Sequence, residues 1–276
     1  DMSWLPLLPG TASALVGPGR QLHHALQLVS GFGLAYVPPQ ADDSHSNLGW
    51  SDLHGALGSR SVTVPAGEIS LGLRVGDLSI LLMLEDEERG SLSLDSVTMD
   101  EAAVAIREWL AAHSLDPARY TLRRHFDIPH HPVADGARFS VGDPSSLGQW
   151  HAWLGNTMGV ISEAARERGG SEVRLWPHHA DMATLITIAP GRTTGAGLAM
   201  GDATSAEPYF YVNAHPAPDA TALPTTLAGE GQWHTDGWIG AILPAAFLAS
   251  APQPQYEQVV RFLDSALDAT TRLLTA

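Results

Sequence analysis

The segment RLWPHHADMATL, residues 174–185, carries the densest set of side chains that could do chemistry. His178, His179 and Asp181 stand there in a run that otherwise has the composition of a buried β-strand. Successive strand side chains point to opposite faces, so His179 and Asp181 are predicted to share one face and His178 to lie on the other. Pro177 lacks a backbone N–H, which favours an edge strand or a bulge, and a bulge could turn both histidines toward one pocket.

Two later segments add polar side chains to predicted strands. In EPYFYVNAH, Tyr209 and Tyr211 fall on one face of the strand, and Glu207 precedes it. In GQWHTDGWIGAIL, His234 stands between two tryptophans, which could wall a cavity. We therefore expect a pocket lined by these four side chains together with the histidine and aspartate of the first segment.

His179 and Asp181 could serve in three ways, and the sequence leaves all three open. Completed by His215 or His234, with His234 preferred, they would form the two-histidine, one-carboxylate ligand set of one divalent metal, such as Zn, Fe or Mn. In a metal-free site Asp181 would fix the tautomer of His179, which would act as a general base. In the third alternative the two side chains only satisfy each other's hydrogen bonds at a sheet edge.

The composition excludes several kinds of chemistry. The 276 residues include no cysteine, and all 15 basic residues are arginine. Disulfides, thiolate nucleophiles, lysine Schiff bases and a P-loop lysine are therefore impossible. A formal net charge of −15 disfavours nucleic acid as a partner, because phosphate binding needs a basic footprint. The sequence also lacks the motifs G-x-S-x-G, H-E-x-x-H and G-x-G-x-x-G.

The distribution of apolar residues argues against a membrane protein. The sequence has no run of about 20 apolar residues, and its N-terminal stretch lacks the basic region of a signal peptide. We therefore expect a cytoplasmic protein whose partner is a small-molecule ligand or substrate, with no membrane partner. The oligomeric state is left open.

Helices and antiparallel strands are both expected along the chain. In the segment Ile69–Val75, apolar residues alternate with small or polar ones. Gly76-Asp77 then forms a tight turn and Leu78–Glu85 returns as a second strand, so the sequence predicts a β-hairpin. Further strands are predicted over 91–97, 172–188, 209–213 and 233–243. Helical spacing predicts helices over 21–29, 98–113, 146–168 and from 255 onward, with capping boxes at Thr98 and Ser146. This pattern favours an α+β fold with antiparallel sheets flanked by helices.

A stretch rich in proline, glycine, serine and aspartate near the midpoint predicts two halves. We expect an N-terminal α+β half over 1–128, a linker over 129–148 and a C-terminal α+β half over 149–276 that carries the candidate site. A shift of 139 residues aligns Gly31 with Gly170 and Asp42 with Asp181. The halves are then either a duplication related by a pseudo-two-fold axis or similar by chance, and both alternatives stay open.

In the segments that carry the candidate site residues, the chain resembles an uncharacterised bacterial family of unknown function. The resemblance covers the second half well and the first half loosely. In the family the position of His178 is often glutamate, so this chain departs from the pattern there. The family suggests that the segments holding the candidate site residues form one site, but it implies no reaction. The matching residues are Trp176-Pro177, His179 and Asp181, then Gly201-Asp202, Glu207-Pro208-Tyr209 and Tyr211-Val212, then the Gly-Ala-rich strand after Trp238.

The leading hypothesis from the sequence is an enzyme that acts on a small molecule in this pocket. His178 and Glu207 would supply acid or base groups, and Tyr209 and Tyr211 would donate hydrogen bonds to a substrate oxygen. A non-catalytic small-molecule-binding module is the first alternative. A structural protein with internally satisfied polar pairs is the second.

Overall fold

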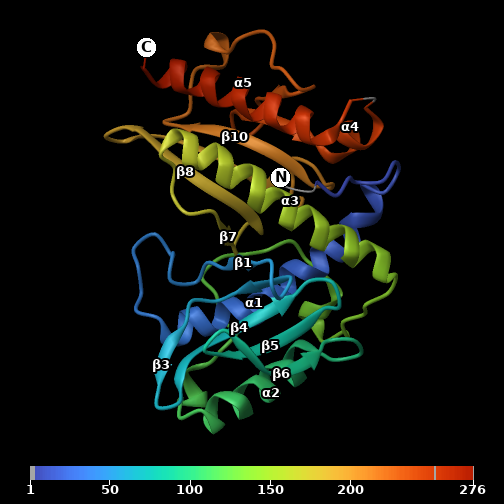
Figure 1. The fold of residues 1–276 in the computed structure, drawn as a ribbon, viewed down its shortest axis with the longest axis vertical. Helices are drawn as coiled ribbons and strands as arrows, with labels where there is room; N and C mark the ends of the chain where they lie inside the picture. Colours follow the sequence, from blue (N-terminus) through green and yellow to red (C-terminus); the bar gives the residue numbers. More distant parts are fainter. Residues whose placement is uncertain (1–3, 252, 276) are drawn as a thin grey trace. The chain divides into compact units, whose positions relative to one another are not determined.

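The computed structural model describes residues 4–251 and 253–275. Within them lie five α-helices and two antiparallel sheets of six strands each, which confirms the expected α+β fold. The chain divides into two compact units (Figure 1). The first-sheet unit comprises Gly17–His151 and Arg174–Ala180, and the second-sheet unit comprises Asp1–Val16, Ala152–Val173 and Asp181–Ala276. None of the helices in the described ranges has the length and apolar character needed to span a bilayer.

The first-sheet unit combines a short-stranded antiparallel sheet with two helices. Its strands are ordered β1-β2-β4-β5-β6, and β3 pairs with β4. The strand β7 brings residues 174–176 back to this unit, where Leu48 and Leu175 exchange two backbone hydrogen bonds of 2.9 and 2.8 Å. The elements are α1 (Val16–Tyr36), β1 (Gly49–Ser51), β2 (Ala56–Gly58), β3 (Val62–Val64), β4 (Gly67–Arg74), β5 (Ser79–Leu84), β6 (Glu87–Ser93), α2 (Met99–Ala112), the 3-10 turns η2 (Pro117–Arg119) and η3 (Pro132–Asp135), and β7 (Arg174–Trp176).

Local sequence signals account for much of this unit. The predicted hairpin is β4 paired with β5, and Ile69, Leu71 and Leu73 are fully buried on one face as the alternation requires. The capping box at Thr98 is confirmed, since its hydroxyl accepts the Glu101 N–H and the glutamate accepts the Thr98 N–H in return. These signals succeed because they depend only on residues close together in the chain.

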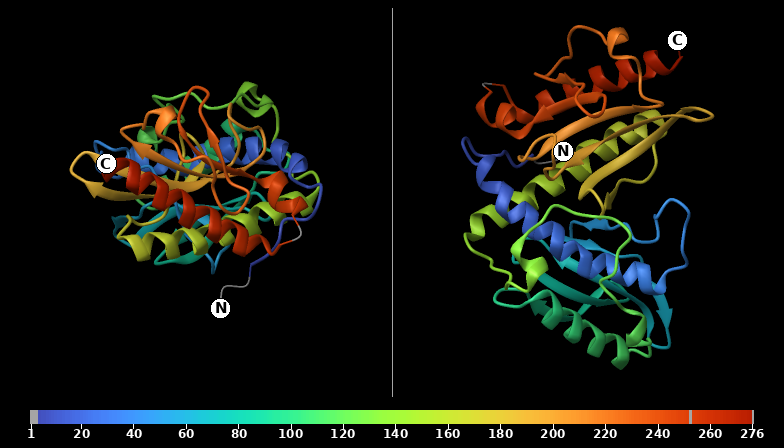
Figure 2. Two further views of the ribbon diagram at one scale, coloured as in Figure 1. Left: turned by 90° about the horizontal axis from the view of Figure 1, so that it is seen from above. Right: turned by 180° about the vertical axis from the view of Figure 1, so that it is seen from behind.

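The second-sheet unit has two layers, a sheet and a pair of helices on one of its faces. Five of the six strands of the second sheet lie in it, in the order β11-β12-β10-β9-β8. Figure 2 shows α3 and α5 on the same side of these strands. The elements are η1 (Ser13–Leu15), α3 (Pro144–Arg168), β8 (Asp181–Ala189), β9 (Arg192–Ala199), β10 (Tyr209–His215), η4 (Ala220–Ala222), β11 (Gln232–His234), β12 (Gly240–Pro244), α4 (Ala245–Ser250) and α5 (Gln255–Thr275).

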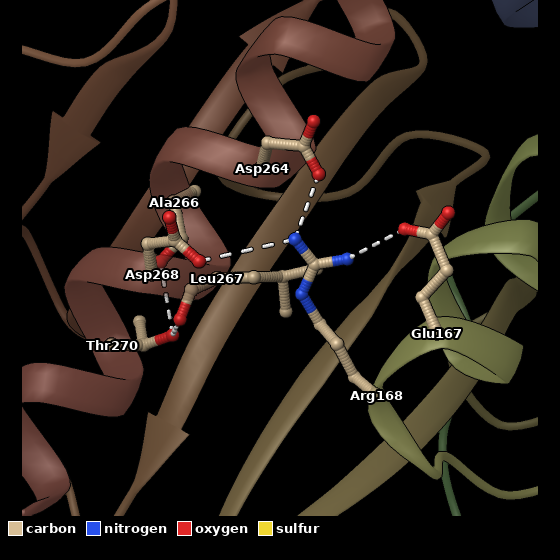
Figure 3. A network of polar contacts seen from close by, with 7 residues as sticks. All are labelled: Glu167, Arg168, Asp264, Ala266, Leu267, Asp268 and Thr270. Carbon is tan, nitrogen blue, oxygen red and sulfur yellow. Dashed lines mark hydrogen bonds and ion pairs between the residues drawn. The ribbon is translucent and has the colours of Figure 1, made fainter.

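The helices bury the apolar face of this sheet. Trp153 of α3 packs its ring 5.8 Å from that of Phe210 on β10, and both side chains are about 1% exposed. At the end of α3, Arg168 links the two helices through Asp264 of α5 at 2.7 Å and reaches Asp268 at 3.9 Å (Figure 3). The opposite face of the sheet is left for polar and aromatic side chains.

Three predictions of local structure were wrong. The strand expected over 172–188 is two strands, because residues 177–180 form a turn in which Ala180 has a left-handed backbone (φ 50°). The strand expected over 233–243 is likewise split into β11 and β12. Helix α3 begins at Pro144, and Asp143 accepts the Ser145 N–H at 3.0 Å where the sequence analysis expected Ser146 to act as the cap.

The expected linker and the expected residue matching also differ from the structure. Residues 129–148 include η3 and the start of α3, and Phe139 is buried with its N–H bonded to the Val97 carbonyl at 2.8 Å. The boundary between units instead falls inside α3. Both units order their elements as helix, antiparallel strands, helix, but Gly31 lies inside α1 whereas Gly170 follows α3. The 139-residue alignment therefore fails, and duplication stays a prediction.

Candidate functional site

The second-sheet unit contains five of the predicted site residues, Asp181, Glu207, Tyr209, Tyr211 and His234, and links two of them directly. The Tyr211 hydroxyl on β10 donates a hydrogen bond to the Asp181 carboxylate at the start of β8. Tyr209 lies two residues before Tyr211 on the same face, with the ring centroids 6.4 Å apart. The predicted face of β10 is thus realised, and its partner on β8 is the aspartate of the first segment.

A second tyrosine–carboxylate pair follows from a residue that the sequence analysis gave no role. Tyr209 donates to the Asp202 carboxylate at 2.7 Å. Asp202 also accepts the Thr204 N–H at 2.7 Å, and its own N–H donates to the Ser205 carbonyl at 2.8 Å. Asp202 therefore folds the loop between β9 and β10 and ties it to the sheet. Its position in the GD…EPY run was a usable signal.

Trp238 contacts both tyrosines and the loop that holds Asp202. Its Nε1–H donates to the Thr204 hydroxyl at 2.9 Å, and its ring packs with Tyr209 and Tyr211 around Ala199 and Ile242. Gly240 is required beneath the indole, because a Cβ there would lie 2.1 Å from the Trp238 ring. We call Asp181, Tyr211, Tyr209, Asp202, Thr204 and Trp238 the tyrosine–carboxylate face.

The sheet register explains why these side chains gather. Ala199 of β9 is paired with both Asp181 and Tyr209, and Gly197 is paired with Tyr211. Glycine is needed at 197, since a Cβ would lie 2.5 Å from the Met182 carbonyl. Small residues along the central strand leave room for the long side chains of its neighbours.

Electrostatics keep both tyrosines in the protonated form. Burial is the largest cause that raises the pKa of Tyr211 well above its usual value of 10, and the neighbouring negative charge of Asp181 raises it further. Burial likewise raises the pKa of Tyr209, followed by its hydrogen bond to Asp202. Both hydroxyls are thus proton donors at neutral pH, and each donates to a carboxylate of the protein.

The remaining predicted residues take no part in the two tyrosine–carboxylate hydrogen bonds. His178 and His179 belong to the turn at 177–180 in the first-sheet unit, and their rings lie 4.5 Å apart. The prediction that His179 and Asp181 share one strand face is wrong, because the strand begins only at Asp181. His234 packs on Trp238 with centroids 5.0 Å apart and bonds the Asp236 carbonyl at 2.6 Å. Glu207 is half-buried in the loop before β10.

The structure gives no support to the predicted metal site. Across residues 4–251 and 253–275, no three His, Asp or Glu side chains gather so that they could hold a metal ion. His179, Asp181 and His234 are all among these residues. Metal binding by this set stays a prediction.

No family model matches this chain, and no match was found among curated proteins or solved structures. The resemblance to an uncharacterised bacterial family stays a prediction.

Proposed function

We propose that this protein is a binding module whose tyrosine–carboxylate face takes a small organic cation, such as an ammonium or guanidinium compound. The observation that carries this is the pairing of two aspartates with two tyrosine hydroxyls on one sheet face. An aspartate placed beside aromatic rings attracts a cation through both its charge and the ring faces.

The charge of the chain supports this choice of ligand. The formal net charge is −15, which raises the local concentration of cations. Asp181 and Asp202 act together, because each carboxylate affects the pKa of both tyrosines. Asp202 is exposed and Trp238 is half-buried, so a cation can approach the face from solvent on the Asp202 side, whereas the Oδ1 atom of Asp181 is buried.

The same hydrogen bonds favour binding over catalysis. A tyrosine hydroxyl has one proton, and Tyr209 and Tyr211 already donate theirs to the aspartates. The tyrosines were expected to donate to a substrate oxygen, and in this arrangement they instead hold the carboxylates in place. The alternative of an enzyme would need a further acid or base, for which Glu207 remains the candidate.

Calorimetric titration with agmatine tests the proposal, because agmatine carries both an ammonium and a guanidinium group. The wild-type protein should bind agmatine, and Asp202→Asn, which neutralises the exposed carboxylate of the face, should bind it about tenfold or more weakly, since a hydrogen bond to a charged group contributes roughly 1.5–3 kcal/mol. The matched control is Asp219→Asn, which removes one charge from an exposed turn of the same unit. It should bind as the wild type does.

The neutral diol 1,4-butanediol serves as the ligand control. If the wild type shows no saturable heat with millimolar agmatine, the proposal is wrong. The proposal is equally wrong if agmatine and the diol bind with the same affinity, because the aspartates should attract only a positively charged ligand.

A further inference from the structure

A second candidate binding site lies in the first-sheet unit, and its wall includes no residue of the tyrosine–carboxylate face. A cavity of about 410 Å³ opens on the sheet face opposite Leu71 and Leu73. This volume falls within the range of about 300–1,000 Å³ usual for small-molecule pockets. Its wall includes Arg174, His54, Ser70, Leu81 and Met83.

The floor of the cavity is a row of glycines. Gly49 pairs with Gly58, Gly58 with Gly72, and Gly72 with Leu81, so the glycine row crosses β1, β2 and β4 and ends beside Leu81 of β5. Strands lie about 4.8 Å apart, so the three glycines leave about 10 Å of bare backbone.

Packing does not explain two of these three glycines. A Cβ on Gly72 would meet its nearest neighbours at 3.6–3.7 Å, which is ordinary contact, and a Cβ on Gly58 would meet nothing closer than 3.9 Å. Glycine inside an element costs roughly 0.5–1 kcal/mol relative to alanine. The fold could accept side chains here, so the open space above the row is what these glycines provide.

The two ends of the row differ in chemistry. At one end the Arg174 guanidinium lies over Gly49, where a Cβ would be 2.5 Å from Nη1. Asn47 orients this side chain, with its side-chain oxygen 3.0 Å from Nε and its carbonyl 3.3 Å from Nη2. At the other end Ala56, Leu81 and Met83 form a small buried apolar cluster.

We propose that this cavity binds a small molecule with a flat apolar body and one anionic group, such as an aromatic carboxylate. The apolar body lies along the glycine row toward Leu81 and Met83, and the anionic group meets Arg174. An arginine on the wall of a cavity in a strongly acidic protein gives this site a preference opposite to that of the tyrosine–carboxylate face.

Titration with 2-naphthoate tests the inference, with 2-naphthylmethanol as the neutral counterpart of the same size. The wild type should bind 2-naphthoate at least about tenfold more tightly than the alcohol. Gly72→Val should weaken binding of both probes by about tenfold or more, because its Cβ makes ordinary contact with Leu81 and Ala56 and its methyl groups occupy space above the glycine row.

Gly76→Val is the matched control, because it adds the same side chain at a place where a Cβ meets nothing within 4 Å and outside the cavity wall. It should bind 2-naphthoate as the wild type does. Arg174→Gln should abolish the preference for the acid over the alcohol, and Asp181→Asn should leave both affinities unchanged. Absence of saturable binding by the wild type at millimolar 2-naphthoate, or equal loss in Gly72→Val and Gly76→Val, would overturn the inference.

Discussion

Acidification is expected to destabilise the first-sheet unit through His23 of α1. This side chain is only 4% exposed, and its Nε2 lies 2.9 Å from the Pro177 carbonyl. Gln27 donates to the same oxygen at 2.9 Å, so α1 holds the 174–180 segment through two side chains. Burial lowers the pKa of His23 from 6.5 to about 4, and the hydrogen bond to Pro177 only partly opposes this effect. The folded protein therefore holds His23 neutral, with Nε2–H as the donor.

The size of the effect follows from the difference between the folded and unfolded pKa values. Between pH 6.5 and about 4 the unfolded chain binds more protons at His23 than the folded chain does, so the free energy of unfolding falls as the pH falls. At 1.36 kcal/mol for each pKa unit, the difference corresponds to about 3 kcal/mol. The stability is fully present above pH 6.5 and is lost by about pH 4. The pKa of His24 is also lowered by burial, which acts in the same direction.

Urea denaturation followed by circular dichroism at pH 7.5 and pH 4 measures this loss. The variant His23→Gln keeps an N–H donor of similar reach toward Pro177 but has no proton to gain, so its loss of stability should be smaller by about 3 kcal/mol. His130→Gln, which replaces an exposed histidine of the same unit, is the control. If His23→Gln loses as much stability on acidification as the wild type, the reasoning from its burial is refuted.

Three predictions concern single positions in helices or at a helix cap, and the same urea titration at neutral pH checks all three. Gly33→Ala should lower the free energy of unfolding by about 2 kcal/mol despite the better helix propensity of alanine, because its Cβ would lie 2.4 Å from the His45 carbonyl oxygen. Gly148→Ala in α3, where a Cβ meets nothing within 4 Å, should instead raise stability by up to about 1 kcal/mol, and equal effects at the two glycines would contradict the packing. Thr98→Ala should cost about 1 kcal/mol through loss of the capping box, and an unchanged midpoint would show that α2 does not need it.

The sequence predicted correctly those structural elements that depend on interactions between residues close together in the chain. The β4–β5 hairpin and the cap of α2 depend on residues within a few positions of each other, and both were found. The turn at 177–180 was missed because none of its residues is glycine or asparagine, the usual residues for a left-handed backbone. Ala180 adopts that backbone all the same.

Contacts between distant residues account for the other errors. His23 and His24 of α1 are both buried against the Pro177 and Pro129 carbonyls, 154 and 105 positions away, and no pattern within the helix indicates these partners. The glycine row has the same origin, since each glycine is unremarkable on its own strand and the row exists only after three strands pair. A site of this kind is not visible in any single segment.

The division of the chain has a consequence for its synthesis. The last seven residues of the first-sheet unit, Arg174–Ala180, follow in the sequence after Ala152–Val173, which belong to the other unit. The first-sheet unit is therefore complete only after the ribosome has synthesised the chain as far as Ala180. A proteolytic fragment ending at His151 would lack Arg174, the arginine of the cavity wall. Neither unit is a single continuous length of polypeptide, so neither can be excised with one pair of cuts.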